Sequence, residues 1–479
     1  MANNGPYAQK AEGFYGGNAG KDNIMDMHKY IDEHRDAMVS DLKTLLRIPS
    51  VEGEPQPGAP FGSEVRRALD TALEMCRKLG LHAVNADGYA GYAEIPGCTG
   101  EQIGVLTHLD VVPCGKGWSY PPFDAYEKNG VVWARGVCDD KGPLVASVYA
   151  LAAYAQSGAQ PKKNIRLIFG CNEESGWGCI DYYSAHVGLP EVGFSPDADY
   201  PIINTEKGIY QCTLSRDINC GSYEVSIHGG DRPNVVAPEA KAVIKGNTDK
   251  LAFALLEYDC HSNGISYTVQ KDTVTITSKG VPAHASTPQE GKNAVWPLLE
   301  LISRLPMDGE LPAAAKEIYE KLCRTTDGSG IGLALCDEVS GALTDNLGII
   351  ELENGRLSLT VDIRFPVTFS DKTVREGLLA AFPGYTLSEG HVQQPHHTPK
   401  EHYLVQALSR VYERRTGQEA HCIAIGGGTY ARALKTGVAF GVNRPGAPEY
   451  AHNTDERMSM DELMEDVHMF ADVYKELAD

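Results

Sequence analysis

Three short, almost continuous apolar runs constrain the fold of this chain more than any other feature. They are IGVLTH (103–108), VVWARG (131–136) and IRLIFGCN (165–172). Runs of this length and composition are typical of strands that are buried on both faces of a sheet. Between the last two lies GPLVASVYALAAYAQSG, which predicts a packed helix ending at Gly158. Because strands and helices alternate, the sequence predicts an α/β domain with a mainly parallel central sheet.

Amphipathic helices are expected on either side of these strands and again near the end of the chain. Apolar residues recur at helical spacing from Asp22 to about Leu46 and over Ser63–Leu79. The α/β pattern returns at EHYLVQALSRVYERRTG (401–417) and GVAFGV (437–442). The α/β domain is therefore predicted to be built from both halves of the chain.

The pattern changes after about Thr205, which indicates an inserted domain. DTVTITSKG (272–280) and GRLSLTVDIRFP (355–366) alternate strictly and predict half-exposed strands, with an amphipathic helix at 291–305 between them. This is the pattern of an α+β domain. We therefore divide the chain into an N-terminal tail, a first catalytic part, an inserted domain and a second catalytic part, at 1–22, 23–205, 206–395 and 396–479.

Composition excludes several classes of protein. The formal net charge of −21 argues against nucleic-acid binding, which relies on clustered Lys and Arg. No apolar stretch approaches the roughly 20 residues that cross a bilayer. The twelve cysteines are scattered without a CxxC pair, which indicates reduced thiols and a cytoplasmic location.

Six acidic and imidazole side chains supply the ligands that a two-metal hydrolase needs. They are His108, Asp139, Glu173, Glu174, Asp197 and His452. Five of them end or closely follow apolar runs, and ligands of open α/β sheets bind beyond the carboxyl ends of strands. Two imidazoles and three carboxylates would bind two metal ions, with one carboxylate left to handle protons. We expect Asp139 to bridge the metals.

Glu173 and Glu174 should take different roles, because adjacent residues in an extended chain point apart. We assign Glu174 to a metal and Glu173 to the water. Asp110 follows His108 at strand spacing and could accept its second imidazole N–H. Each motif alone also fits a plainer structure, namely a polar strand end, a helix-capping loop or a solvated acidic turn.

The joint set of motifs is more specific. HLDVVP, ARGVCDDKGP, CNEESG, SPDADYPIINTEKG, GVPAHASTPQEGKNA, DIRFP, GGGTYAR and AHNTDE occur in this order. In this the chain resembles the metallopeptidase family of carnosinase-type dipeptidases, aminoacylases and glutamate carboxypeptidases, and most of all its PepV-type, Xaa-His-like dipeptidases. The resemblance covers nearly all of the chain after the tail. It implies a zinc-peptidase-like catalytic domain with an inserted lid domain.

The resemblance also implies a role for each matching residue. One zinc would bind His108, Asp139 and Asp197, and the other Asp139, Glu174 and His452. Glu173 would be the general base, Asp110 the partner of His108, and His284 the residue that polarises the scissile carbonyl. The substrate would contact Arg364 through its carboxylate, and would also contact Asn234, Gly428 and Thr429.

We therefore expect a cytoplasmic, monomeric dipeptidase with two divalent metal ions, zinc or else manganese or cobalt. Its partner would be a small peptide, with no nucleic acid and no membrane. An N-acyl amino-acid deacylase on the same scaffold is one alternative, since it would share every metal ligand and Arg364. A catalytically inactive metal-binding protein is a second alternative, of another class.

Overall fold

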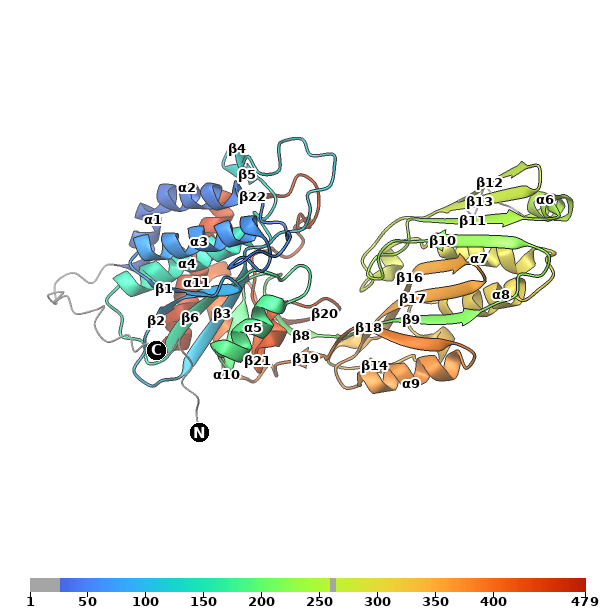
Figure 1. Ribbon diagram of the computed structural model, residues 1–479. Coiled ribbons are helices and arrows are strands. Elements are labelled where there is room, and N and C mark those ends of the chain that lie inside the picture. Colours follow the sequence, from blue (N-terminus) through green and yellow to red (C-terminus); the bar gives the residue numbers. More distant parts are fainter. Residues whose placement is uncertain (1–25, 259–263) are drawn as a thin grey trace. The chain divides into compact units, whose positions relative to one another are not determined.

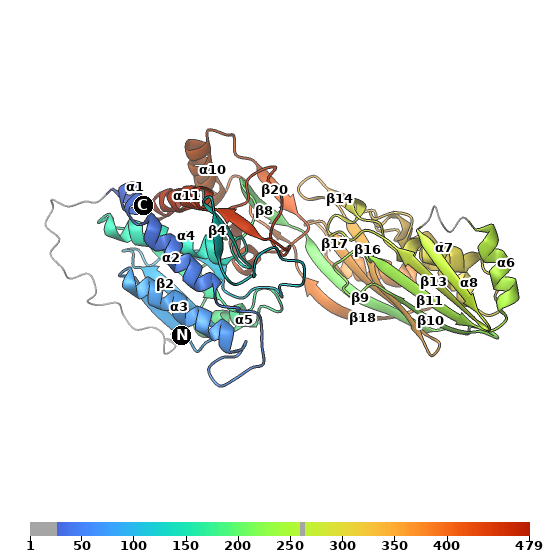
Figure 2. The ribbon, with the colours of Figure 1, turned by 90° about the horizontal axis from the view of Figure 1, so that it is seen from above.

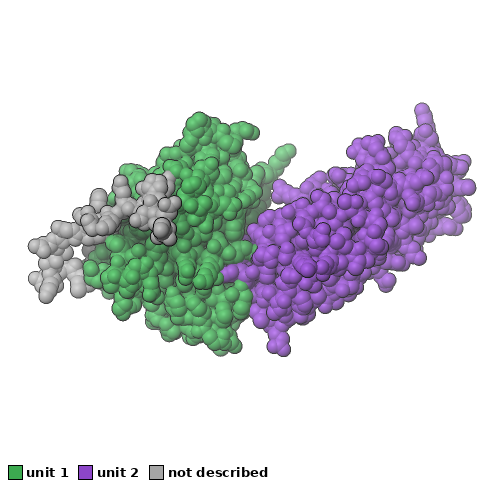
Figure 3. Space-filling view, turned by 60° about the horizontal axis from the view of Figure 1, so that its bottom comes forward, with its two compact units in different colours: residues 1–204, 397–423, 429–479 green, residues 205–396, 424–428 purple. Residues whose placement is uncertain are grey.

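The computed structural model describes residues 26–258 and 264–479, so the predicted N-terminal tail lies outside the described residues. The chain divides into two compact units (Figure 3). The first comprises the described residues up to Asn204, together with His397–Ile423 and Thr429–Asp479. The second comprises Thr205–His396 and Ala424–Gly428.

One short segment differs from the predicted domain division. Residues 424–428 were expected in the catalytic domain but belong to the second unit. The backbone N–H of Lys207 donates to the carbonyl of Ile425 at 2.9 Å. The guanidinium of Arg364 donates to the carbonyl of Gly426 at 2.7 Å. These contacts join residues that are far apart in the sequence, so the local sequence of the segment does not predict them.

A nine-stranded sheet forms the centre of the first unit (Figure 1). Its order is β1 (His82–Ala86), β2 (Ala90–Ile95), β6 (Asn164–Gly170), β3 (Gln102–His108), β7 (Val192–Ser195), β21 (Thr436–Ala439), β8 (Ile202–Glu206) and β19 (His396–His397), with β20 (Cys422–Ile425) on β8. The strands from β6 to β21 are parallel, whereas β1, β2 and β8 pair antiparallel. The α/β prediction is confirmed, with a sheet that is parallel at its centre and mixed overall.

The run VVWARG forms a strand in a different sheet from the one expected. β5 (Val131–Trp133) lies in a three-stranded sheet between β4 (Tyr126–Lys128) and β22 (Arg457–Ser459), and both pairings are antiparallel. Only Val132 of β5 is fully buried. The run is therefore a half-buried strand of a small antiparallel sheet. The prediction of a strand in the central sheet was wrong, because apolar composition alone does not distinguish the two.

Helices pack around the sheet of the first unit (Figures 1 and 2). They are α1 (Met27–Glu33), α2 (Arg35–Leu46), α3 (Ser63–Lys78), α4 (Lys141–Gln156), α5 (Gly178–His186), α10 (Tyr403–Thr416), α11 (Met460–Ala478) and the short η3 (Tyr430–Ala433). The helix predicted from Asp22 onward is two helices, because His34 leaves helical geometry between them. α4 is buried over almost its whole length and packs against α11.

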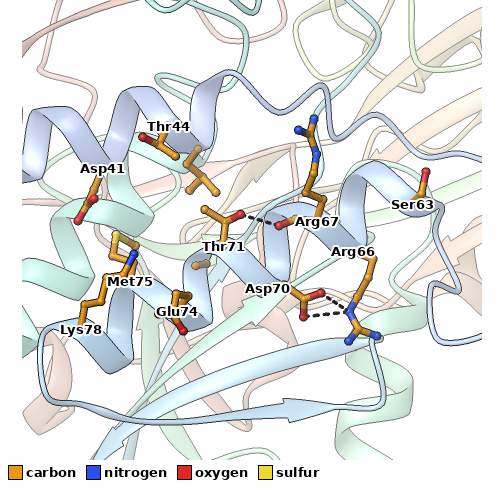
Figure 4. Close-up of a pocket in the computed structure, with 12 residues that line it drawn as sticks. Asp41, Thr44, Ser63, Arg66, Arg67, Asp70, Thr71, Glu74, Met75 and Lys78 are labelled. Carbon is orange, nitrogen blue, oxygen red and sulfur yellow. Dashed lines mark hydrogen bonds and ion pairs between the residues drawn. The ribbon is translucent and has the colours of Figure 1, made fainter.

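An open groove of about 520 Å³ lies between α2 and α3 (Figure 4). Two of the side chains that line it, Arg66 and Asp70, form an ion pair at 2.9 Å. None of the residues that we predicted to form the functional site lines this groove. In the part of the chain that the structure describes, no helix is both long and apolar enough to cross a membrane.

The second unit has an eight-stranded antiparallel sheet and its own core. The order is β12 (Ile265–Gln270), β13 (Thr273–Lys279), β11 (Glu239–Lys245), β10 (Glu224–Gly229), β16 (Thr344–Glu353), β17 (Arg356–Phe365), β9 (Gly208–Asp217) and β18 (Thr386–Gln393). The remaining elements are α6 (Thr248–Glu257), α7 (Val295–Arg304), α8 (Leu311–Leu322), α9 (Asp371–Ala381), η1 (Pro288–Glu290), η2 (Ser329–Ile331), β14 (Cys336–Asp337) and β15 (Gly341–Ala342). The predicted alternation holds along β13, but the last five residues of β17 are all buried.

Candidate metal centre

The carboxyl ends of three neighbouring parallel strands bring the predicted ligands together. His108 is the last residue of β3, Glu174 follows β6, and Asp197 follows β7. Asp139 lies two residues before the start of α4, and His452 lies in the loop before β22. Parallel strands all end at one edge of the sheet, so residues that are distant in sequence meet there.

Asp139 lies between the two histidines. Its Oδ1 is 2.8 Å from Nε2 of His108, and its Oδ2 is 2.8 Å from Nε2 of His452. Oδ2 of Asp197 is 3.4 Å from the same nitrogen of His108, and Oε2 of Glu174 is 3.0 Å from that of His452. Two groups of three potential ligands result, and they share Asp139.

The geometry of the potential ligand atoms suits metal ions better than it suits hydrogen bonds between these atoms. Nε2 of His108 and Oδ1 of Asp139 are buried and, within the described residues, have no hydrogen bond of acceptable geometry, although they lie 2.8 Å apart. Each group offers one imidazole and two carboxylates, a set that Zn²⁺ accepts. These atoms could therefore hold two cations, with one carboxylate shared between them.

Burial and like charges dominate the electrostatics of the acidic side chains. Burial raises the pKa of Glu174 to about 7, aided by the negative charge of Asp139. Burial and the carboxylate of Asp139 also raise the pKa of Asp197. Burial opposes ionisation of Asp139 as well, but His108 and His452 outweigh it and hold the pKa of Asp139 below its usual value. Carboxylates crowded in this way need nearby cations in order to stay ionised.

The histidines show the reverse effect. Burial lowers the pKa of His452, but the carboxylates of Asp139 and Glu174 outweigh it and raise the value to about 11. In the same way, Asp110, Asp139 and Asp197 outweigh burial and raise the pKa of His108 well above its usual value. The carboxylates that surround the two imidazoles therefore favour a positive charge at this position, and a metal ion bound there would compete with a proton for the ring nitrogens.

Glu173 differs from its neighbour. Within the described residues its carboxylate makes no hydrogen bond or ion pair with another side chain. Burial, the largest effect, and the nearby carboxylates raise its pKa well above the usual range. A half-buried carboxyl group without a side-chain partner, beside the two ligand groups, is suited to accept a proton.

Asp110 makes more contacts than the sequence predicts. Nδ1 of His108 lies 3.0 Å from the backbone carbonyl of Asp110 and 3.5 Å from its carboxylate. That carboxylate accepts the backbone N–H groups of Glu173 and Glu174, both at 3.0 Å. Asp110 therefore connects the ends of β3 and β6 and fixes the direction in which the two glutamates leave the backbone.

Sequence reasoning missed the residues that hold the loop around Asp139. Glu456 is fully buried, pairs with Arg135 at 2.7 Å and accepts the backbone N–H groups of Gly136 and Cys138. Asp140 accepts the backbone N–H of His108 at 2.9 Å. Arg135 lies in the motif ARGVCDDKGP and Glu456 in the motif AHNTDE. Their place beside predicted ligands in these motifs could have indicated a role in the site.

The remaining predicted residues, except Thr429, belong to the second unit. The backbone carbonyl of Asn234 accepts the N–H of Ala285, which places Asn234 beside the segment of His284. Gly428 belongs to the second unit, whereas Thr429 belongs to the first and caps η3 by accepting the N–H of Ala431.

Arg364 is buried, with 4% of its surface exposed. Its Nε and Nη2 donate to Asp362 at 2.6 and 2.9 Å, and its Nη1 donates to the carbonyl of Gly426. A guanidinium has five N–H groups. Two of them therefore have no partner among the described residues, one on each Nη, and they form the edge that a carboxylate can accept from.

Residues 104–476 match the model of peptidase family M20/M25/M40. The chain belongs to this family. The family predicted from the motifs is thereby confirmed. The match covers most of both units, so the inserted second unit is part of it.

Relatives in this family match over nearly their full length. The protein YtjP of Bacillus subtilis (strain 168) is 38% identical over 455 residues, which cover 93% of this chain and 98% of that protein. A Beta-Ala-Xaa dipeptidase of Lactobacillus delbrueckii subsp. lactis is 31% identical over 464 residues, which cover 95% of this chain and 98% of that protein.

A solved structure of human carnosine dipeptidase 1 shares the fold. The TM-score is 0.57 at 18% identity, over 94% of this chain and 98% of that one. Aminoacylhistidine dipeptidase from Vibrio alginolyticus gives a TM-score of 0.56 at 12% identity, over 92% and 96% of the chains. The predicted fold, a catalytic α/β domain with an inserted second domain, is thereby confirmed.

Proposed function

We propose that this protein is a metallodipeptidase that hydrolyses the peptide bond of unblocked dipeptides with two divalent metal ions, most simply zinc. The observation that carries the proposal is the position of Asp139, with one oxygen toward each histidine. One carboxylate shared between two ligand groups is the arrangement of co-catalytic sites. The similarity to the Beta-Ala-Xaa dipeptidase of Lactobacillus supports the choice of a dipeptide as substrate.

In this proposal five side chains bind the metals and one handles protons. His108, Asp139 and Asp197 would hold one ion, and Asp139, Glu174 and His452 would hold the other. When bound, the two ions would lower the pKa of a water molecule and polarise the scissile carbonyl. Glu173 accepts the proton of that water and then delivers it to the leaving amine. A raised pKa suits Glu173 to both steps.

Asp110 acts through its neighbours. Its carbonyl and carboxylate face Nδ1 of His108, which leaves Nε2 for the metal. Its carboxylate also holds the backbone of Glu173 and Glu174. We assign it the role of orienting one ligand and the base together.

Residues of the second unit would act on the substrate. His284 donates a hydrogen bond to the carbonyl oxygen as negative charge develops there, a contact typically worth ~3 kcal/mol. Arg364 offers its two remaining N–H groups to the terminal carboxylate of the dipeptide. Asn234 and Gly428 would also contact the substrate, as would Thr429 of the first unit. Recognition of that carboxylate would restrict the length of the substrate.

Metal analysis combined with a substrate panel tests the proposal. Purified protein should bind two divalent ions per chain, cleave unblocked dipeptides and lose activity with a chelator. The panel should also contain N-acetyl and N-succinyl amino acids. A strong preference for these acylated substrates would instead identify a deacylase. Two bound metals without turnover on either set would identify an inactive metal-binding protein.

The assembly and location that we propose are a monomer in the cytoplasm, with a small peptide as the only partner. Eleven cysteines of the described residues are free, as expected for thiols in a reducing compartment. Light scattering during size-exclusion chromatography would give the mass of the particle. A dimer mass would contradict the monomer.

A further inference from the structure

Ser286 makes two contacts with the imidazole of His284 inside the second unit. The Ser286 hydroxyl oxygen lies 2.7 Å from Nδ1 of His284. The backbone N–H of Ser286 also donates to this nitrogen, at 3.3 Å. Both contacts are on the same ring nitrogen.

The backbone contact decides which nitrogen of His284 carries the proton. A hydroxyl can donate or accept, but a backbone N–H can only donate. If Nδ1 carried a hydrogen, it would face the hydrogen of the Ser286 N–H. Nδ1 must therefore be the acceptor, and the neutral imidazole carries its proton on Nε2. The Ser286 hydroxyl then donates to Nδ1 as well.

The surrounding backbone holds this arrangement in place. The N–H of Ala285 donates to the carbonyl of Asn234 at 3.0 Å, and the N–H of Thr287 donates to the carbonyl of His284 at 3.0 Å. His284 also forms an isolated bridge with Val235. The turn that presents Ser286 to the ring is thus fixed on both sides of His284.

We propose that Ser286 is a positioning residue that sets the tautomer of His284, so that Nε2 is always the N–H donor. This inference rests on the proposed function, in which His284 donates to the substrate carbonyl. The other neutral tautomer would present a lone pair at Nε2, which would repel the oxyanion. A donor that is already oriented needs no reorganisation during the reaction.

The tautomer can be measured without any assay of activity. In full-length protein with ¹⁵N-labelled histidine, long-range ¹H–¹⁵N spectra distinguish a protonated ring nitrogen from an unprotonated one. Comparison with His284→Asn assigns the signals. We expect Nε2 of His284 to be protonated and Nδ1 to be unprotonated at neutral pH. A protonated Nδ1 in the neutral ring would overturn the proposal even if the protein is not a dipeptidase.

Kinetics then test whether Ser286 acts through His284. Ser286→Ala removes one hydrogen bond and should lower kcat on the preferred dipeptide about fivefold, with little change in KM. Ser286→Thr keeps a hydroxyl and should restore most of the loss. In a His284→Ala background, Ser286→Ala should have no further effect. An equal loss in both backgrounds would overturn the proposal.

A matched variant separates this effect from a general loss of structure. Ser388 is an exposed serine of β18 in the same unit. Ser388→Ala should leave kcat, KM and the histidine spectra unchanged. If Ser286→Ala shifts neither kcat nor the His284 ring signals relative to this control, Ser286 does not position the ring.

Discussion

Two identical neighbouring residues, Glu173 and Glu174, have very different surroundings. Glu174 lies 3.0 Å from Nε2 of His452, whereas Glu173 has no side-chain partner among the described residues. Asp110 holds the backbone of both, so the two side chains leave from fixed positions. The different roles that we propose for Glu174 and Glu173, ligand and base, would therefore arise from the direction of the side chain and not from residue type.

Replacing Glu173 tests its proposed role directly. Glu173→Gln keeps the shape of the side chain but removes the proton acceptor, so kcat should fall about 1,000-fold. The metal content should stay at two ions per chain, because Glu173 belongs to neither ligand group. Kinetics with elemental analysis would measure both. Glu191→Gln, at an exposed site, is the control; near-full turnover of Glu173→Gln with metal bound would refute the assignment.

Asp345 should make the stability of the protein depend on pH. Its side chain is buried and accepts the N–H of Gly328 at 2.7 Å, and burial raises its pKa to about 7. The unfolded chain releases this proton near pH ~4, so the folded state binds it more tightly. The resulting stability is fully present below about pH 4 and is lost as the pH rises to about 7.

Asp345→Asn removes this titration while keeping the shape of the side chain. The unfolding temperature of the unsubstituted protein should fall between pH 5 and pH 8. In Asp345→Asn this fall should be smaller by about 3 °C or more. Calorimetry at several pH values would measure it, with exposed Glu338→Gln as the control. An identical pH profile in the two variants would show that Asp345 does not titrate in this range.

For single residues, the sequence allowed some functional roles to be predicted and not others. His108 and Glu174 could be located because apolar runs end beside them. Ser286 and Glu456 could not, since their roles depend on contacts rather than on a local pattern. Glu456 contacts Arg135, which lies 321 residues earlier in the chain. Arg364 was predicted on an alternating strand, but the final residues of β17 are buried on both faces.

Among the elements, the loop between β5 and α4 shows how a buried charge can shape backbone. Glu456 accepts N–H groups from Gly136 and Cys138 while it pairs with Arg135. Asp139 is the next residue of this loop. A single carboxylate from another part of the chain therefore fixes the position of Asp139, the predicted shared ligand.

Glu456→Gln should disturb both stability and metal binding. It leaves the charge of Arg135 buried without its partner, which typically costs about 3–5 kcal/mol. The displaced loop should also lower the metal content below two ions per chain. Thermal unfolding and elemental analysis would measure these effects, with exposed Glu465→Gln in α11 as the control. Full metal occupancy at unchanged stability would contradict this account of the loop.

Gly426, in the segment 424–428, should not tolerate a larger side chain. A Cβ on Gly426 would lie 2.6 Å from the Cβ of Ser286, and the carbonyl of Gly426 accepts from Arg364. Gly426→Ala should displace both neighbours and lower kcat/KM about tenfold or more. On Gly384 the nearest atom to a new Cβ is 3.9 Å away, so Gly384→Ala is the matched control. Equal kinetics for both variants would exclude the close contact.

Elements with a clear period were predicted well, and their pairing was predicted less well. α3, α4 and β13 agree with the predicted helices and strand to within a few residues. VVWARG was assigned to the wrong sheet, because a short apolar run looks the same in a hairpin and in a parallel core. The break at His34 was missed, since the apolar period continues across it.

On the scale of the whole molecule, the two units contribute unequally to metal binding. All five predicted ligands belong to the first unit, which has its own core. Metal binding should therefore stabilise this unit, by about 4 kcal/mol when free metal exceeds Kd 1,000-fold.

Hydrogen exchange can measure this asymmetry in the intact protein. Addition of a chelator should increase exchange in the first unit, around His108, Asp139, Glu173 and His452. The core strands of the second unit should exchange at the same rate as before. Mass spectrometry of peptides from both units, at constant ionic strength, provides the comparison. Similar increases in both units would contradict the prediction.

The order in which the first unit's sheet is threaded has a consequence for synthesis on the ribosome. β21 pairs with both β7 and β8, two strands made more than two hundred residues earlier. A nascent chain that has emerged only as far as the second unit already carries His108, Asp139 and Asp197, but it lacks β21, which pairs with β7 on the side away from β3. Such a chain therefore carries the residues of one potential metal group before the sheet that positions them is complete, so a prematurely terminated product should fail to fold its first unit.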